Sequence, residues 1–393
     1  MIKELSVRLN GVQIGMLKLV RGKMEFSYDE SAKIPISLSL PLQDAPFKEK
    51  VCRSFFGGLL PENANMREKL AEKYKININD DFKLLQSIGG DCAGAVSFCE
   101  PNEPQIEEDY VKLAGKIFSD EELRQKIQEL PYRPYMGNRI SLAGAQEKTA
   151  ICMIDENFVE PNNNVPTTHI LKTALPAYTE SIQNEYICMK TAAELGLDVA
   201  NVEIRKVDNL EVLLIERFDR EFKDGKLKRI LQEDFAQSLG VQSRDKYKIS
   251  FKDCLWVLER TKVPIDAKIK FVKQVVYNYL IGNTDAHGKN FSLFLSGEKA
   301  NTLTPAYDLL CSSVYDCDKK LAMKIGKANY YKDVTETDWK LFANDIDISP
   351  NFVFSELEKQ KSKLPNAMKK IVDELNCEIG FKIFDYIKSF CDK

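Results

Sequence analysis

Residues 282–291 read GNTDAHGKNF and follow an apolar run, KIKFVKQVVYNYLIG at 268–282, whose pattern predicts a helix. Asp285 precedes Asn290 by five positions, which is the Asp-x-x-x-x-Asn spacing of a kinase catalytic loop. In that arrangement the carboxylate accepts the proton of an attacking hydroxyl, while the amide oxygen binds Mg²⁺ beside the phosphates. The same residues are also typical of a polar loop capped by Asp and Gly, so the segments around them decide the interpretation.

A second carboxylate follows in the order that this chemistry needs. Asp308 lies eighteen residues after Asn290 in the segment LTPAYDLL, and the intervening FSLFL predicts a strand. Kinases use an Asp in a turn after such a strand to hold Mg²⁺ between the β- and γ-phosphates. Taken alone, an Asp in a turn that begins at proline is common. The order of the three residues is therefore what predicts a metal site.

A lysine upstream of this loop is a candidate phosphate ligand. Lys172 ends the apolar run HILK at 169–172, where a strand would hold its ammonium over the α- and β-phosphates. Most strand lysines simply face solvent, so the assignment of Lys172 as a phosphate ligand depends on the motifs that precede and follow it. A carboxylate on the next helix should hold the lysine in register, and both Glu180 and Glu185 qualify. We favour Glu185.

A small-residue segment, SLAGAQEKT at 141–149, predicts a turn whose exposed backbone N–H groups bind phosphate oxygens. Lys148 adds positive charge to it. The segment is not G-x-G-x-x-G, and as an isolated loop it would more often be structural, with Ser141 a plain turn residue. The residues that we assign to ATP binding in this loop are Ala143, Gly144, Ala145, Gln146 and Lys148.

The expected nucleotide-base hinge lies in EVLLIERFD at 211–219, where an apolar strand changes to a charged segment. The backbone of Glu216, Arg217 and Phe218 is expected to read the adenine edge there.

The composition limits the classes of function that remain. At roughly 150 residues per domain, 393 residues predict two or three domains, and 44% hydrophobic residues are enough for a large core. The net charge of −3 gives no general attraction to nucleic acid or to anionic membranes, which argues against direct DNA binding. The N-terminus alternates apolar and polar residues, and no apolar stretch approaches 18 residues, so neither secretion nor membrane spanning is expected.

The cysteines and histidines argue against a transition-metal site. Ten cysteines never form a C-x-x-C pair, and such scattered thiols indicate a reduced, cytoplasmic protein. His169 and His287 are the only histidines, so a three-histidine site cannot form, and any metal should bind oxygen ligands.

Local signals predict the remaining elements. Residues 5–9 and 12–17 alternate around Asn10-Gly11, a dipeptide typical of a type I′ hairpin turn. Ser119 and Glu122 form a capping box at the start of a helix that runs through Leu130. The acidic, proline-containing stretch at 100–110 is expected to be a solvated linker.

Together these segments resemble the HipA family of serine/threonine kinase toxins from bacterial type II toxin–antitoxin modules. The similarity covers about residues 5 to 330, in the motifs FFGGLLPENANMREKLAEKY, GGDCAGAVSF, ISLAGAQEKTAI, HILKT, ERFDR, LQEDFAQSLG, GNTDAHGKNFS and LTPAYDLL. The resemblance implies an α+β fold, a protein kinase-like two-lobed fold with an added N-terminal α+β subdomain and a mainly helical C-terminal lobe. We place the subdomain at 1–104, a linker and helix at 105–136, the kinase N-lobe at 137–218 and the helical C-lobe at 219–393.

The resemblance also implies roles for the motif residues. By match, Asp285 is the catalytic base, Asn290 and Asp308 hold Mg²⁺, and Lys172 contacts the ATP phosphates. Ser141 matches the serine that members autophosphorylate.

Two further loop residues, His287 and Lys289, would line the phosphate site, with Lys289 grouped with the catalytic residues. His287 could equally be a core hydrogen-bonding residue.

The expected partners follow from the same resemblance. They are a small helix-turn-helix antitoxin, HipB-like, that supplies the DNA contacts, and a protein substrate such as glutamyl-tRNA synthetase or another aminoacyl-tRNA synthetase. Two alternatives stay open. One is a kinase of a small molecule or lipid head group. The other is a non-catalytic module that uses nucleotide to set its affinity for a DNA-bound repressor.

Overall fold

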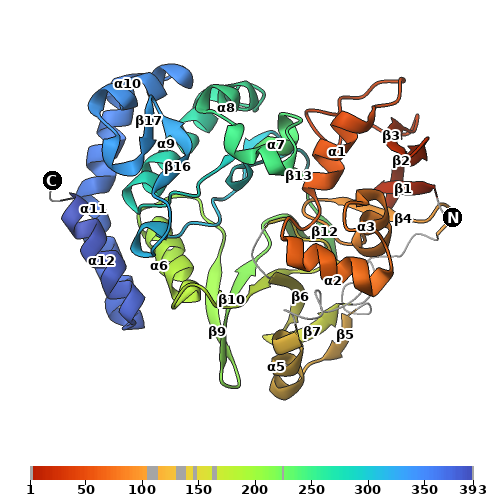
Figure 1. Cartoon of the computed structure of the whole chain (residues 1–393), viewed down its shortest axis with the longest axis horizontal. Coiled ribbons are helices and arrows are strands. Elements are labelled where there is room, and N and C mark those ends of the chain that lie inside the picture. Colours follow the sequence, from red (N-terminus) through yellow and green to blue (C-terminus); the bar gives the residue numbers. More distant parts are fainter. Residues whose placement is uncertain are drawn as a thin grey trace. The chain divides into compact units, whose positions relative to one another are not determined.

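The computed structural model describes residues 3–103, 114–129, 139–144, 148–161, 166–223 and 225–391. The chain forms two compact units that are interleaved in sequence (Figure 1). The N-terminal unit comprises residues 1–173, 205–244 and 294–300, and the C-terminal unit comprises residues 174–204, 245–293 and 301–393. The domain boundaries drawn from the sequence stay a prediction.

The N-terminal unit begins with a four-stranded antiparallel sheet in the order β3-β2-β1-β4. Asn10 and Gly11 join the first two strands with φ angles of 47° and 81°, so the predicted hairpin is confirmed. The strands are β1 (Glu4–Leu9), β2 (Val12–Val20), β3 (Lys23–Tyr28) and β4 (Val96–Cys99).

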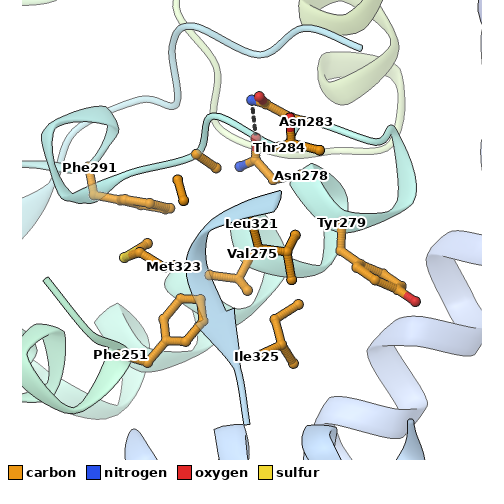
Figure 2. Close-up of a pocket in the computed structure, with 12 residues that line it drawn as sticks. Phe251, Val275, Asn278, Tyr279, Asn283, Thr284, Phe291, Leu321, Met323 and Ile325 are labelled. Carbon is orange, nitrogen blue, oxygen red and sulfur yellow. Dashed lines mark hydrogen bonds between the residues drawn. The ribbon is translucent and has the colours of Figure 1, made fainter. Parts of the chain in front are cut away.

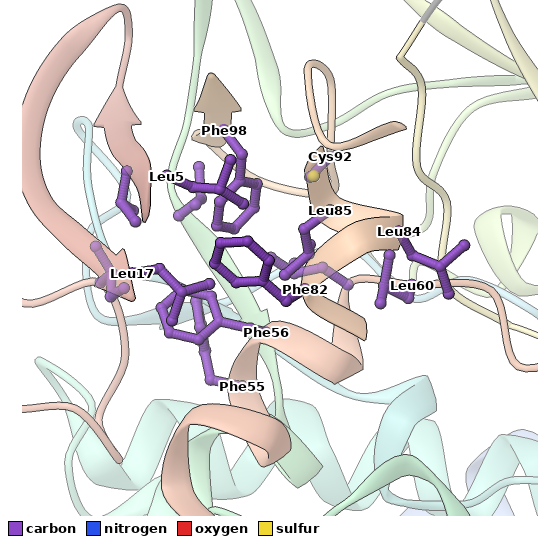
Figure 3. Close-up of a cluster of buried hydrophobic side chains, with 14 of the residues drawn as sticks. Leu5, Leu17, Phe55, Phe56, Leu60, Phe82, Leu84, Leu85, Cys92 and Phe98 are labelled. Atoms are coloured by element: carbon purple, nitrogen blue, oxygen red, sulfur yellow. The ribbon is translucent and has the colours of Figure 1, made fainter. Parts of the chain in front are cut away.

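Three helices supply the other half of this core, α1 (Glu49–Gly58), α2 (Ala64–Tyr74) and α3 (Asp81–Ile88). Leu5 and Leu17 of the sheet lie against Phe56 and Phe82 of the helices, and all four side chains are buried (Figure 3). Alternate strand residues point inward because successive side chains of a strand face opposite sides of the sheet. The same core extends to Ile140, Leu142 and Leu231, so the proposed phosphate loop starts on the N-terminal core.

A second sheet of the N-terminal unit has six strands in the order β5-β7-β6-β8-β10-β9. Helix α5 (Asp120–Glu129) covers it through Leu123 and Ile127, which pack with Ile151 and Leu171. Its N-terminal capping box is as predicted, since the backbone N–H of Ser119 donates to Glu122 and that of Glu122 donates to Ser119. The strands are β5 (Ala114–Ile117), β6 (Lys148–Ile154), β7 (Asn157–Pro161), β8 (His169–Lys172), β9 (Val202–Val207) and β10 (Leu210–Glu216).

The C-terminal unit is mainly helical. Helix α11 packs on α6, α9, α10 and α12, and the shared core contains Phe271, Tyr277, Phe342 and Met368. The helices are α6 (Ser181–Glu194), α8 (Phe251–Leu258), α9 (Pro264–Leu280), α10 (Glu336–Asp345), α11 (Pro350–Leu375) and α12 (Glu378–Cys391), accompanied by short strands that include β16 (Lys320–Ile325) and β17 (Ala328–Tyr330). In the part of the chain that the structure describes, no helix is long and apolar enough to span a membrane.

Candidate functional site

The loop after helix α9 is fixed to its surroundings before it reaches Asp285. Gly282 has a φ angle of 69°, and a Cβ atom there would lie 2.7 Å from the Tyr386 ring, so only glycine fits. Asn283 then donates from its amide to Asn278 Oδ1 at 2.7 Å and accepts from the N–H of Asp285 at 3.2 Å. These contacts hold the loop backbone on the end of the helix.

Asp285 is presented to solvent on this rigid loop. Its own carbonyl accepts from the N–H of His287 at 2.8 Å, and the preceding Thr284 is anchored by Ser312 Oγ at 2.8 Å. The carboxylate oxygen Oδ1 accepts a hydrogen bond from the Tyr247 hydroxyl at 2.9 Å. A carboxylate with a fixed backbone and an accessible side chain suits a general base.

Asn290 and Asp308 lie together, as the sequence predicts. The Asn290 amide nitrogen is 3.3 Å from Asp308 Oδ2, while its amide oxygen accepts from the N–H of His287 at 3.1 Å. Asp308 has a φ angle of 53°, a conformation in which Asp is more common than most residues, and its carbonyl accepts from Asn283 at 3.3 Å. One carboxylate and one amide oxygen are a donor set that fits Mg²⁺, because this ion keeps several waters and binds substrate phosphates. Among the described residues no larger cluster of His, Cys, Asp and Glu could hold a metal.

The other two loop residues, His287 and Lys289, are buried. The His287 ring packs edge to face on Tyr247, with ring centroids 5.3 Å apart. The Lys289 carbonyl accepts from the Tyr307 hydroxyl at 2.7 Å. Both contacts hold the loop, and the expected phosphate contacts of the two side chains stay a prediction.

An apolar pocket lies behind this loop (Figure 2). Leu321, Met323 and Ile325 of β16 face Val275 and Tyr279 of α9 across it, and Asn283 and Thr284 of the loop border it. No acidic or basic side chain belongs to its described lining, so the pocket supports the loop and carries no chemistry of its own.

The N-terminal unit brings two of the predicted phosphate ligands together. Lys148 of β6 and Lys172 of β8 are register partners in antiparallel strands, so their side chains leave the same face of the sheet. Lys172 is buried, and the ammonium of Lys148 lies over Gly144, where a Cβ atom would come within 2.7 Å of it. Two lysines on one face of the sheet, one of them beside a glycine turn, are a candidate basic site for phosphate oxygens.

Ser141 is not an exposed turn residue. Its side chain is fully buried, its hydroxyl donates to the Leu59 carbonyl at 2.7 Å, and its N–H donates to the Asp91 carbonyl at 2.9 Å. The expectation of exposed N–H groups along the loop is wrong at this residue because the N-terminal subdomain pairs with it. Gly144 pairs likewise through its carbonyl, which accepts from the N–H of Glu62 at 3.1 Å. Ala143 is half-buried, whereas Ala145 and Gln146 lie outside the described residues.

The proposed hinge segment starts at Glu216, the last residue of β10, and its role in reading adenine stays a prediction. Glu216 is exposed, and Phe218 packs edge to face on Phe294. The N–H of Arg217 already donates to the Thr168 carbonyl at 2.9 Å, so this N–H is not available to bind the adenine edge.

The Arg217 side chain belongs to a buried charge cluster that the sequence analysis did not anticipate. We call the five residues Asp91, Arg217, Asp219, Arg220 and Arg229 the Asp91 cluster. Oxygens of Asp91 lie 2.8 Å from Arg220, 3.1 Å from Arg229 and 3.2 Å from Arg217. Arg217 and Arg220 also pair with Asp219 at 2.8 and 3.1 Å. The ERFDR and GGDCAG segments contain most of these residues, but in the sequence they indicate only the family resemblance and not a charge cluster.

Burial and the charges of the neighbouring side chains together set the pKa values in this cluster. Burial opposes the ionisation of Asp91, but the guanidinium groups outweigh it and hold the pKa of this carboxyl well below its usual range. Burial and the neighbouring Arg217 lower the pKa of Arg220 to about 10. Asp91 is thus a permanent anion within the N-terminal unit.

The two candidate partners of Lys172 differ in their surroundings. Glu180 has a φ angle of 50° and accepts from the N–H of Ile379 at 2.6 Å, so it holds the start of α12. Glu185 is buried within α6, and our preference for it stays a prediction.

Two family comparisons agree with this geometry. Residues 5–99 match the HipA N-terminal domain, and residues 140–379 match the HipA-like C-terminal domain. The chain belongs to the HipA family. Y4mE of Sinorhizobium fredii, which is named as a kinase, is 34% identical over 95% of this chain and 93% of its own length. The serine/threonine-protein kinase toxin HipA of Shewanella oneidensis is 28% identical over 87% of this chain and 82% of its own.

A solved structure supports the fold directly. The chain is similar to HipA in the complex of Shewanella oneidensis HipA, HipB and operator DNA, with a TM-score of 0.84 and 25% identity. The match covers 98% of this chain and 95% of that chain. The predicted α+β fold class, with its added N-terminal subdomain, is confirmed, and the chain is a kinase of HipA type.

Proposed function

We propose that this HipA-family kinase is a Mg-ATP-dependent protein serine/threonine kinase that acts as a growth-arresting toxin. The observation that carries the proposal is the loop on which Asp285 is solvent-accessible while Asn290 and Asp308 lie 3.3 Å apart. Within the N-terminal unit, Lys148 and Lys172 are register partners that support phosphate binding.

The residues divide the work of phosphoryl transfer. Bound Mg-ATP supplies the transferable phosphoryl group and the charge that neutralises it. Asp285 orients the acceptor hydroxyl and takes its proton at a carboxylate oxygen. Asn290 and Asp308 would hold the metal, Lys148 and Lys172 would hold phosphate oxygens, and the backbone around Phe218 would read the base.

Ser141 is the proposed site of self-modification. A phosphate would add about −1.5 to −2 charges and three acceptor oxygens, which its buried position against Leu59 and Asp91 cannot accommodate. The modified segment must therefore leave that position, and the ATP phosphates lose part of their site. Peptide mass spectrometry of the protein expressed alone should find phosphate on Ser141 in the wild type and none in Asp285→Asn. Equal phosphate in both would assign the modification to another kinase.

The proposed partners follow from the relatives. The matched HipA structure contains HipB and operator DNA, which supports a HipB-like helix-turn-helix antitoxin here and DNA contact only through it. The net charge of −3 agrees with that indirect role. The proposed substrate is an aminoacyl-tRNA synthetase, of the glutamyl type or another.

Phosphoproteomics after induced expression tests the function. Wild type should raise phosphoserine or phosphothreonine on one or a few proteins, whereas Asp285→Asn should not. Asp385→Asn, an exposed acid on α12, is the matched control and should behave as wild type. Label from γ-phosphate-labelled ATP that enters a small molecule or lipid would favour that alternative. ATP binding without any Asp285-dependent label would favour the non-catalytic module.

A further inference from the structure

The Tyr247 hydroxyl makes a hydrogen bond to the proposed catalytic base. Its phenol oxygen lies 2.9 Å from Asp285 Oδ1 and donates a hydrogen bond to it. Tyr247 belongs to the short 3₁₀ helix η1 (Ser243–Lys248), and 54% of its surface is exposed. The contact therefore forms at the open side of the loop, where substrate must arrive.

Neighbouring residues hold this segment against the catalytic loop. The Tyr247 ring packs edge to face on His287, and the Lys246 ammonium lies 5.3 Å from the ring centroid. The buried Ile249, two residues after Tyr247, packs closely on Gly288. A Cβ atom added to Gly288 would lie 2.6 Å from the Ile249 side chain. The hydroxyl is therefore directed at Asp285 by packing on its own segment, and not by the hydrogen bond alone.

The chemistry of the contact is that of substrate binding. A general base for phosphoryl transfer must accept a hydrogen bond from the hydroxyl that attacks. A phenol that donates to Oδ1 of the same carboxylate occupies one of its acceptor sites and keeps water or a serine hydroxyl out of that site. We propose that the Tyr247 hydroxyl is a built-in occupant of the acceptor-hydroxyl site, which water or substrate must displace before transfer. This inference rests on the proposed function of Asp285.

ATP hydrolysis without a protein acceptor tests the inference, because water is then the only competing hydroxyl. Tyr247→Phe keeps the ring on His287 and removes only the donor, so hydrolysis of Mg-ATP should rise about three- to tenfold, which is the effect of losing one ordinary competing hydrogen bond. Tyr330→Phe, an equally conservative change at another exposed tyrosine, should leave the rate unchanged. In an Asp285→Asn background, Tyr247→Phe should change nothing, since the amide still accepts a hydrogen bond but cannot take the proton of an attacking hydroxyl.

The outcomes separate two failures. Hydrolysis that is equal in wild type and Asp285→Asn would refute the assignment of Asp285 and this inference with it. Hydrolysis that depends on Asp285 but is unchanged or lower in Tyr247→Phe would overturn the occupant role alone, because a tyrosine that positions the base would lose activity when shortened. Thermal unfolding of Tyr247→Phe should match wild type. Tyr247→Ala, which also removes the ring, should show a rise at least as large.

Discussion

Asp91 and Asp285 are carboxylates in opposite surroundings. Asp91 is buried, three guanidinium groups contact it, and the Thr167 hydroxyl donates to it at 2.7 Å. Asp285 is exposed, and its carboxylate accepts a hydrogen bond from the Tyr247 hydroxyl. A carboxylate that is fully paired cannot accept a substrate proton, whereas an accessible one can. The comparison separates a structural anion from the proposed catalytic one.

The Asp91 cluster also ties together separate segments of the N-terminal unit. The Asp91 carbonyl accepts a hydrogen bond from the N–H of Ser141, and the N–H of Asp91 donates to the Arg139 carbonyl at 2.9 Å. Its side chain pairs with Arg217 and Arg220, which lie at and just after the proposed hinge. One buried residue therefore contacts both the segment that begins at Ser141 and the segment after β10.

Breaking the Asp91 cluster should give the largest change in stability. Asp91→Ala leaves three buried guanidinium groups without their shared anion, so the free energy of unfolding should fall by about 3–5 kcal/mol. Denaturant unfolding followed by fluorescence measures it, and Asp385→Ala on the exposed face of α12 should change it by less than about 0.5 kcal/mol. A loss below about 1 kcal/mol for Asp91→Ala would mean that the cluster is not a structural centre.

Glu233 is a second buried carboxylate to compare with Asp91. It contacts serine hydroxyls and the Leu38 N–H, where Asp91 contacts arginines. Burial raises its pKa from 4.5 to about 7. The folded state therefore binds this proton more tightly than the unfolded chain, so its stabilisation is present below pH 4.5 and is lost as the pH rises through 7. Over that window the loss amounts to about 3 kcal/mol.

Glu233→Gln keeps the acceptor for Leu38 and removes the titration. The variant should show a flatter stability profile between pH 5 and 8 and should exceed wild type at pH 8. Unfolding curves collected across that range compare the two proteins. Parallel profiles would show that Glu233 does not carry this pH dependence.

A smaller effect is expected at the proposed metal site. Asp308→Ala removes a hard oxygen ligand and leaves Asn290, so half-maximal ATP binding should need about 10- to 100-fold more Mg²⁺. Titration with Mg²⁺ at fixed ATP measures the shift. An unchanged Mg²⁺ dependence would remove Asp308 from the metal site.

The sequence predicted the local elements because their signals are local. The Asn10-Gly11 turn, the Ser119–Glu122 capping box and the helix before Asp285 each depend on residues within one or two turns. The Asn290–Asp308 pair was also predictable, since a known motif order brings these residues together.

Contacts across long separations were not predictable. Asp91 and Arg217 are 126 positions apart, and no periodicity links them. Ser141 is buried by Leu59, 82 positions away, so its segment looked like an exposed turn. Tyr247 precedes Asp285 by 38 positions in a segment without a motif. Each of these contacts depends on tertiary packing.

The central claim is that Asp285 is the base of a protein kinase, and transfer of labelled γ-phosphate by the purified protein tests it most directly. Asp285→Asn keeps the size and the acceptor oxygen for Tyr247 but loses the proton acceptor, so transfer should fall by about 10²- to 10⁴-fold with folding and ATP binding retained. Near wild-type transfer by this variant at saturating Mg-ATP would contradict the account.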